Sequence, residues 1–287
     1  MLLPTDWPDI WGLLPLLYIE MHYRWFPGGS RYFRREPEIL ADLPRRIEPG
    51  HPIPLLLLVK DAHRYPILLE SLQVEIANDG KRQVLEQITL NEQIDSLWWR
   101  RLIEVDRPAL EGTVDLHITF NYRVRGRSRT CLTHNLPLLK RQPLQTWLAN
   151  DPLPGTGVVW GDIHHHTSYT RDMIEYGAPL EAGQAMAAAM GLGFVCASDH
   201  SYDLDDAPGQ WYRTDPQLQR WLESRERIAQ LNSDNATLII PGEEVTVNNS
   251  RRRNMHALVL DHPDYLPGSG DGGENPLKRS SELDLNA

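Results

Sequence analysis

The stretch VVWGDIHHHT at residues 158–167 determines how the second half of the chain is interpreted. Its first three residues are apolar and predict a buried strand that continues to the first histidine. His164 and His166 are two residues apart, so their side chains point to the same side of an extended strand. Two imidazoles that converge at the end of a strand can supply half of a metal site.

The rest of this half alternates between strand and helix patterns. Apolar runs predict strands, and an alanine-rich and an amphipathic segment predict helices. The expected strands cover 158–164, 194–198, 238–240 and 255–260, and the expected helices cover 179–190 and 216–231. This order is typical of a parallel sheet or barrel, whose active site collects at the carboxyl ends of the strands.

Residues of the kind that bind metals lie beside each of these strands. The candidate ligands are His164, His166, Asp172, His200, Glu244 and His256. Most of them stand at or just after the carboxyl end of a strand, whereas His256 stands near the start of one. Imidazole and carboxylate groups are the usual ligands of zinc, manganese and iron.

The same residues suggest a reaction. A carboxylate such as Glu244 can bridge two metal ions, and such a pair can activate a water molecule and hold the leaving oxygen. Metal binding lowers the pKa of that water to about 7, which makes hydroxide available at neutral pH. The pattern therefore predicts a metal-dependent hydrolase.

Two further residues are candidates for catalysis. Asp199 precedes His200 and could orient a ligand or the attacking water. Arg252 lies in a run of three arginines at 251–253, between two ligand positions. A solvated loop explains this run without any function, whereas the functional interpretation is a phosphate clamp, because a guanidinium group suits phosphate oxygens.

These motifs resemble the PHP family, named for polymerase and histidinol phosphatase. The family's opening motif G-D-L-H-x-H-T/S stands here as GDIHHHT at 161–167, and Asp172 holds the ligand position six residues after its second histidine. The family's T-D-H stands as SDH at 198–200, and its P-G-x-E stands as PGEE at 241–244. The resemblance thus implies that Glu244 is a ligand and that Glu243 is a spacer.

The resemblance covers about residues 158–260, with His256 matching a later family histidine at the start of a strand. It implies a distorted seven-stranded β/α barrel with two or three divalent ions of zinc, manganese or iron. Family members continue with further strands that carry another histidine and a final D-x-H pair. Beyond His256 this chain has only His262 before it ends at Ala287. We therefore expect a truncated PHP-type domain over 158–287.

The first half of the chain has a different pattern. Between 114 and 124, apolar residues alternate strictly with polar ones, which predicts a strand with one buried face. Several such strands predict an antiparallel β-sandwich over 51–143. An arm of unclear structure over 1–50 precedes it, and a linker over 144–157 follows it.

Composition limits the possible partners. A net charge of −10 argues against binding along a nucleic-acid polymer, but a small anionic substrate can still bind through metal ions. The two cysteines, Cys131 and Cys196, do not suggest a disulfide framework. We read neither a signal peptide nor a membrane span and expect a cytoplasmic protein.

The leading hypothesis is a metal-dependent phosphoesterase that uses a metal-bound hydroxide on a small phosphate ester. One alternative is a PHP-type hydrolase of carbamates or aryl esters. Another is a non-enzymatic module, in which the β-sandwich binds a partner and the half barrel is degenerate. An amidohydrolase with a carboxylated lysine is poorly supported, because Lys278 is the only lysine after His166. A metallo-β-lactamase-like H-x-H-x-D-H motif is missing from the sequence.

Overall fold

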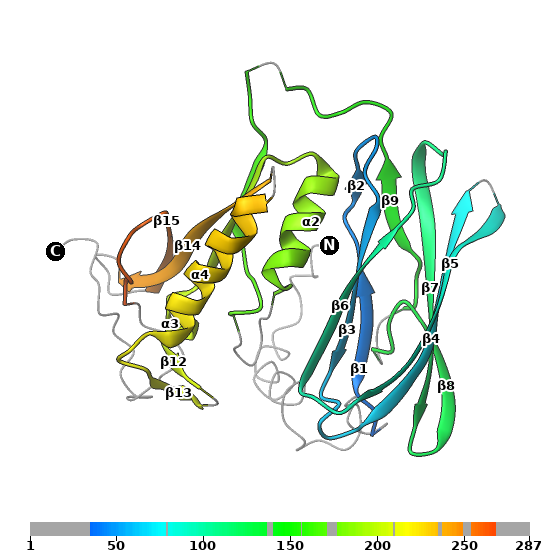
Figure 1. Ribbon diagram of the computed structural model, residues 1–287, viewed down its shortest axis with the longest axis horizontal. Coiled ribbons are helices and arrows are strands. Elements are labelled where there is room, and N and C mark those ends of the chain that lie inside the picture. Colours follow the sequence, from blue (N-terminus) through cyan, green and yellow to red (C-terminus); the bar gives the residue numbers. More distant parts are fainter. Residues whose placement is uncertain are drawn as a thin grey trace, which may run out of the picture. The chain divides into compact units, whose positions relative to one another are not determined.

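The computed structural model describes residues 35–78, 80–136, 140–155, 157–170, 177–208, 210–234, 237–248 and 254–267. The described chain is mostly β-strand, arranged in several sheets with few helices (Figure 1). This high content of strands is consistent with the expected N-terminal β-sandwich. The chain divides into two compact units, of which the first comprises Met1–Leu43 and Leu55–Thr146 and the second comprises Pro44–Pro54 and Trp147–Ala287.

The first unit consists of strands in two sheets. Its strands are β1 (Glu38–Asp42), β3 (Ile53–Lys60), β4 (Ile67–Asn78), β5 (Lys81–Ile94), β6 (Trp98–Val105), β7 (Gly112–Val124), β8 (Arg127–Leu132) and β9 (Leu144–Leu148). One sheet has the order β1-β3-β6, and the other contains β9-β7-β4-β5 with β8 paired to β7. The pairs β1–β3, β4–β5, β4–β7 and β7–β8 are antiparallel, which is consistent with the expected β-sandwich.

Hydrophobic patterning explains these sheets. In β7 the apolar positions 114, 116, 118, 120, 122 and 124 are all buried, as the alternation predicts. β3 is almost entirely apolar and is buried along seven of its eight residues, which is the pattern of a strand covered on both faces. The strands begin earlier and end later than expected. β1 lies within the expected arm over 1–50, and β9 lies within the expected linker over 144–157.

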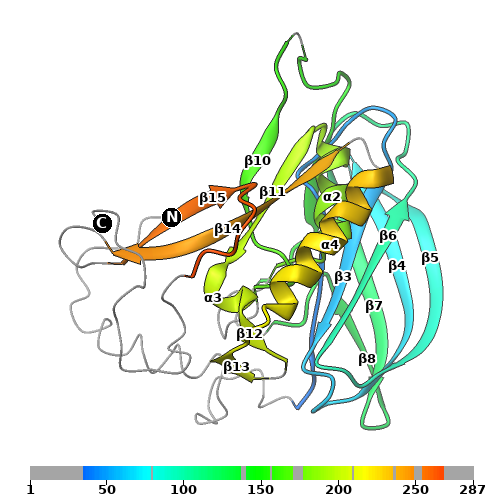
Figure 2. The same ribbon diagram turned by 60° about the vertical axis from the view of Figure 1, so that its left-hand side comes forward.

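The second unit contains a four-stranded sheet with helices. Its strands are β10 (Gly161–His165), β11 (Phe194–His200), β14 (Leu238–Asn248) and β15 (Asn254–Leu260), in the order β10-β11-β14-β15 (Figure 2). Its helices are α2 (Leu180–Met190), α3 (Ser201–Leu204) and α4 (Gln219–Asp234). The described part of this unit also contains the short strands β2 (Arg46–Ile47), which pairs with Trp147 and Leu148 of the same unit, and β12 (Asp206–Ala207), which pairs with β13 (Gln210–Thr214).

The expected parallel arrangement holds for three of these strands. β10 pairs with β11, and β11 pairs with β14, both in parallel. β15 is antiparallel to β14, which corrects the expectation of an all-parallel sheet. Only residues 249–253 join β14 to β15, and a parallel crossover needs a dozen residues or more.

Helices α2 and α4 cover one face of this sheet. Leu180 and Ala187 of α2 and Ile228 of α4 form a buried cluster with Val195, Ala197 and Ile239 of the sheet. α2 follows Pro179 and ends at Gly191, whose left-handed backbone (φ 84°) allows its N–H to bond the last turn. At the start of α4, the side chain of Asp215 accepts hydrogen bonds from the main-chain N–H groups of Gln217 and Gln219, as a capping residue does.

The start of β10 differs from the sequence prediction. Val158, Val159 and Trp160 are 56%, 70% and 45% exposed, and the strand begins only at Gly161. The expected buried strand at this point is therefore wrong. The physical reason is that β10 is an edge strand, paired only with β11 among the described strands, so its approach is not covered from both sides.

Two smaller expectations can also be compared with the structure. Cys131 and Cys196 are both free and buried, and burial raises the pKa of the Cys131 thiol to about 12. None of the helices formed by the described residues is both long enough and apolar enough to cross a bilayer.

The close approach of two chain segments gives a test of the fold. Gly177 donates its N–H to Thr167 O, and a Cβ atom placed on Gly177 would lie 1.8 Å from His166 O. Because that neighbour is main chain, it cannot rotate away. We expect Gly177→Ala to lower the free energy of unfolding by about 1–3 kcal/mol, measured by urea denaturation.

Gly155→Ala is the matched control, because the nearest atom to its added Cβ would be Leu153 O at 3.9 Å, an ordinary contact. An equal loss of stability in both variants would contradict the close approach at residue 177.

Candidate metal centre

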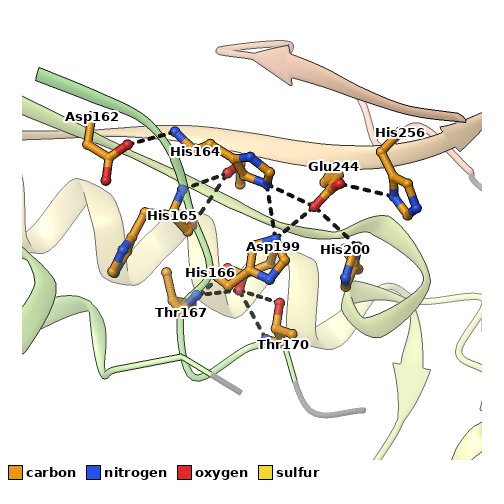
Figure 3. A network of polar contacts seen from close by, with 11 residues as sticks. Asp162, His164, His165, His166, Thr167, Thr170, Asp199, His200, Glu244 and His256 are labelled. Carbon is orange, nitrogen blue, oxygen red and sulfur yellow. Dashed lines mark hydrogen bonds and ion pairs between the residues drawn. The ribbon is translucent and has the colours of Figure 1, made fainter. Parts of the chain in front are cut away.

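Four histidines converge on the carboxylate of Glu244 (Figure 3). Its Oε2 atom lies 2.7 Å from His166 Nε2 and 3.0 Å from His164 Nε2. The same oxygen lies 3.5 Å from His200 Nδ1, and Oε1 lies 3.0 Å from His256 Nδ1. Ring nitrogens therefore approach both oxygens of a single carboxylate.

The strands of the second unit bring these residues together. His164 lies in β10 and His166 follows it, and both rings point to Glu244, as their spacing predicts. His200 and Glu244 are register partners on β11 and β14. His256 is the register partner of Thr246, two residues beyond Glu244 on β14.

These residues form two groups that could each hold a metal ion. The first group is His164, His166 and Glu244, and the second is His200, Glu244 and His256. Within each group the ligand atoms lie within 4.8 Å of one another. The donors are imidazole nitrogens and carboxylate oxygens, which suit zinc, manganese or iron, and Glu244 belongs to both groups.

The electrostatics of Glu244 also suit a ligand. Burial acts to raise the pKa of its carboxyl group. Hydrogen bonds from His164 and His166, together with the charges of His200 and His256, more than offset burial and leave this pKa below its usual value. Glu244 is therefore ionised at neutral pH, the state in which a carboxylate binds a metal.

The site is closed on one side and open on the other. The side chains of Glu244 and His200 are 7% exposed, whereas those of His164 and His256 are 48% and 50% exposed. A substrate would therefore reach the centre past His164 and His256. The half-exposed side chain of His256 also shows that this residue is not part of the buried core.

His165 lies on the opposite side of β10 from its two neighbours. Its ring packs near Gly183 of α2, where an added Cβ would lie 3.0 Å from Nε2. Burial lowers the pKa of this imidazole, so it stays neutral. The ring of His165 therefore faces α2 rather than Glu244.

The carboxylate of Asp199 is buried and binds the loop that follows His166. Its Oδ1 atom accepts hydrogen bonds from Thr167 N at 2.7 Å, Thr170 N at 3.0 Å and Thr170 Oγ1 at 2.8 Å, and its Oδ2 accepts one from Thr167 Oγ1 at 2.7 Å. All of these bonds hold the loop after His166 (Figure 3). Sequence reasoning named Asp199 as an orienting residue but gave neither threonine a role, although Thr167 is the last residue of the GDIHHHT motif and so carried a signal.

Glu243 has a structural role on the helix-covered face. It accepts hydrogen bonds from Trp221 Nε1 at 2.8 Å and from Leu266 N at 3.1 Å. Burial raises the pKa of its carboxyl group. Glu243 thus ties α4 to the segment after β15 and takes no part in the histidine cluster. The two remaining candidates, Asp172 and Arg252, lie outside the described residues.

Comparisons with known proteins do not identify this chain. The sequence matches no known family and no curated protein. Among solved structures, one described as "X-ray structure of Northeast Structural Genomics Consortium target SoR45" is 14% identical and covers 46% of this chain and 94% of its own, with a TM-score of 0.21. This TM-score is too low to show a shared fold.

The shared carboxylate gives a test that does not require a substrate. We expect Glu244→Gln to abolish binding of Zn²⁺ at both groups, because a neutral amide cannot donate two anionic oxygens. Isothermal titration of the metal-free protein with Zn²⁺ measures this loss.

Glu243→Gln is the matched control on the neighbouring residue, and we expect it to bind Zn²⁺ as the unaltered protein does. Equal weakening in the two variants, or unchanged binding in Glu244→Gln, would contradict the assignment.

Proposed function

We propose that the protein is a metal-dependent hydrolase of the PHP type that cleaves a small phosphate ester. The observation that supports this most is a single ionised carboxylate, Glu244, placed between two groups of histidine nitrogens. A carboxylate in that position suits a pair of ions held a few ångströms apart, as found in enzymes that hydrolyse phosphate esters. The four motifs add support, because they occur in the order found in the PHP family.

The fold is compatible with this proposal at a coarser level. Under this proposal, β10, β11 and β14 would correspond to the first strands of a seven-stranded barrel, and the carboxyl ends of these strands would carry the site. α2 and α4 cover one face of this sheet, as the helices of a β/α barrel cover the outside of its strands.

The residues divide the chemistry between them. His164, His166 and Glu244 would hold one ion, and His200, Glu244 and His256 would hold another, with Asp172 as a further ligand. Divalent zinc, manganese or iron at this site would supply Lewis acidity and make water a stronger nucleophile near neutral pH. Glu244 fixes the spacing of the two groups, and Asp199 holds the loop beside His166.

The charge around the site indicates where an anionic substrate would bind. A cavity of about 340 Å³ borders the same loop and is lined in part by Glu181, Glu223 and Glu226. Its one lining arginine, Arg227, is paired with Glu181. Such a wall repels phosphate, so we place the substrate at the open side of the histidine cluster, with Arg252 as the candidate phosphate clamp.

A specific observation favours a second candidate, hydrolysis of carbamates or aryl esters. Tyr202 stacks on His200 with ring centroids 4.6 Å apart. Aromatic side chains next to a metal ligand can bind an aryl group by stacking. The same metal chemistry can act on a carbonyl carbon.

An activity assay tests the proposal and separates the two candidates. With Mn²⁺ or Zn²⁺ supplied, we expect turnover of p-nitrophenyl phosphate to exceed turnover of 1-naphthyl acetate and 1-naphthyl N-methylcarbamate. We expect His164→Ala/His166→Ala to reduce turnover to the background rate, because it leaves the first group with only Glu244.

His63→Asn, an exposed histidine of the first unit, is the control and should retain full activity. Preference for the naphthyl substrates would favour the second candidate. Unchanged turnover in the double variant would contradict metal-dependent hydrolysis by this site, and metal binding without any turnover would favour a binding module.

A further inference from the structure

We infer that Asp199, assisted by Ser198, is a positioning residue that builds the first metal-binding group and leaves the second group nearly untouched. This inference rests on the proposed function. It concerns the main chain that carries His164 and His166, which side chains of β11 bind on either side of His166.

The main-chain pairing between β10 and β11 ends before the first group is complete. The last register pair is His165 with Ala197, and the register shifts between Asp162 and His165. His166 therefore lies beyond the ladder, where main-chain hydrogen bonds to β11 no longer fix its position.

Side chains of β11 replace the ladder at this point. Ser198 Oγ accepts a hydrogen bond from His165 N at 3.0 Å, and Asp199 Oδ1 accepts one from Thr167 N at 2.7 Å. The two main-chain N–H groups on either side of His166 are thus both bound to β11 side chains. This clamp fixes the main chain that carries the His166 ring.

Burial makes the clamp strong. Asp199 is 3% exposed, and its partners Thr167 and Thr170 are 1% and 0% exposed. Four hydrogen bonds converge on this one carboxyl group, and hydrogen bonds are least weakened by water when they are buried. Two of the four donors are main-chain N–H groups, which cannot turn to another acceptor if the carboxylate is removed.

The second group is held in another way. His200 and Glu244 are register partners in the parallel ladder of β11 and β14, and His256 and Thr246 are partners in the ladder of β14 and β15. Continuous main-chain pairing therefore fixes the second group. Loss of the Asp199 carboxylate should release the first group while the second keeps its geometry.

Titration with Co²⁺, followed by its visible absorption, tests this selectivity. We expect Asp199→Ala to raise the Kd of one binding step by about 10- to 100-fold, the usual effect of removing a residue that orients ligands. Its titration should match that of His164→Ala, which removes a ligand of the first group only, and should differ from that of His256→Ala, which removes a ligand of the second group only.

Asp199→Asn should restore most of the binding, because its amide oxygen can replace Oδ1 and its amide nitrogen can donate to Thr167 Oγ1. Asn232→Ala is the control for destabilisation alone. Asn232 bonds both the N–H and the C=O of Ile239 at the opposite end of the sheet, so this variant should leave both binding steps unchanged. Thr170→Val deletes one of the hydrogen-bond donors to Asp199 and should raise the Kd of the same binding step by a smaller factor. This variant replaces Asp199→Ala in the test if Asp199→Ala does not fold.

Hydrogen exchange of the metal-free protein tests the clamp separately. The N–H groups of Thr167 and Thr170 should exchange faster in Asp199→Ala, while those of the β11–β14 ladder keep their protection. Unchanged exchange at both threonines, equal weakening of both cobalt steps, or the same pattern in Asn232→Ala would overturn the inference. Failure of the unaltered protein to bind Co²⁺ would overturn the proposed function, whereas the exchange result would still decide whether the clamp exists.

Discussion

The carboxylate of Glu244 is the centre on which the arrangement of the site depends. Four imidazoles surround it, and their hydrogen bonds and charges hold its pKa down although burial acts in the opposite direction. A buried carboxylate without such partners would become neutral rather than remain charged. The carboxylate also stabilises the positions of the histidines, because its negative charge attracts rings from β10, β11 and β15 to one point. The charge of the carboxylate thus depends on the histidines, and the positions of the histidines depend on the carboxylate.

Successive side chains along β11 and β14 point to opposite faces of the sheet. The candidate ligands therefore lie on one face, and the residues that support them lie on the other. On β11, Val195 and Ala197 face the helices, and the same parity places Asp199 on that side and His200 on the other. On β14, Glu243 is the register partner of Asp199, and Glu244 is the register partner of His200. Glu243 therefore lies on the helix-covered side, where it accepts a hydrogen bond from Trp221 of α4. Two adjacent carboxylates can therefore have opposite roles, one structural and one as a ligand. A shift of one residue in either strand would exchange these roles.

Local pattern was sufficient for much of this arrangement. The spacing of His164 and His166 places both rings on one side, and the burial of alternate residues in β7 follows from its strict periodicity. Proline before α2 and glycine after it mark the helix that the structure contains. The antiparallel β15 was not accessible from the sequence, because the strands expected at 238–240 and 255–260 leave about 14 residues between them, which is long enough for a parallel crossover. The expected buried strand over 158–160 failed, because an apolar run does not reveal whether its strand lies at the edge of a sheet.

The sequence alone does not reveal which side chains hold the main chain of the site in place. Thr170 is an ordinary loop residue in the sequence, and its importance arises from the Asp199 carboxylate that folding brings beside it. The same holds for Gly177, whose small size matters only because the chain passes against His166. Ligand types can be recognised from chemistry and spacing, whereas the residues that hold those ligands depend on contacts between segments distant in sequence. Metal sites require both, because a ligand displaced by a fraction of an ångström binds its ion less tightly. The support around His166 therefore matters to the proposed function as much as the histidines themselves.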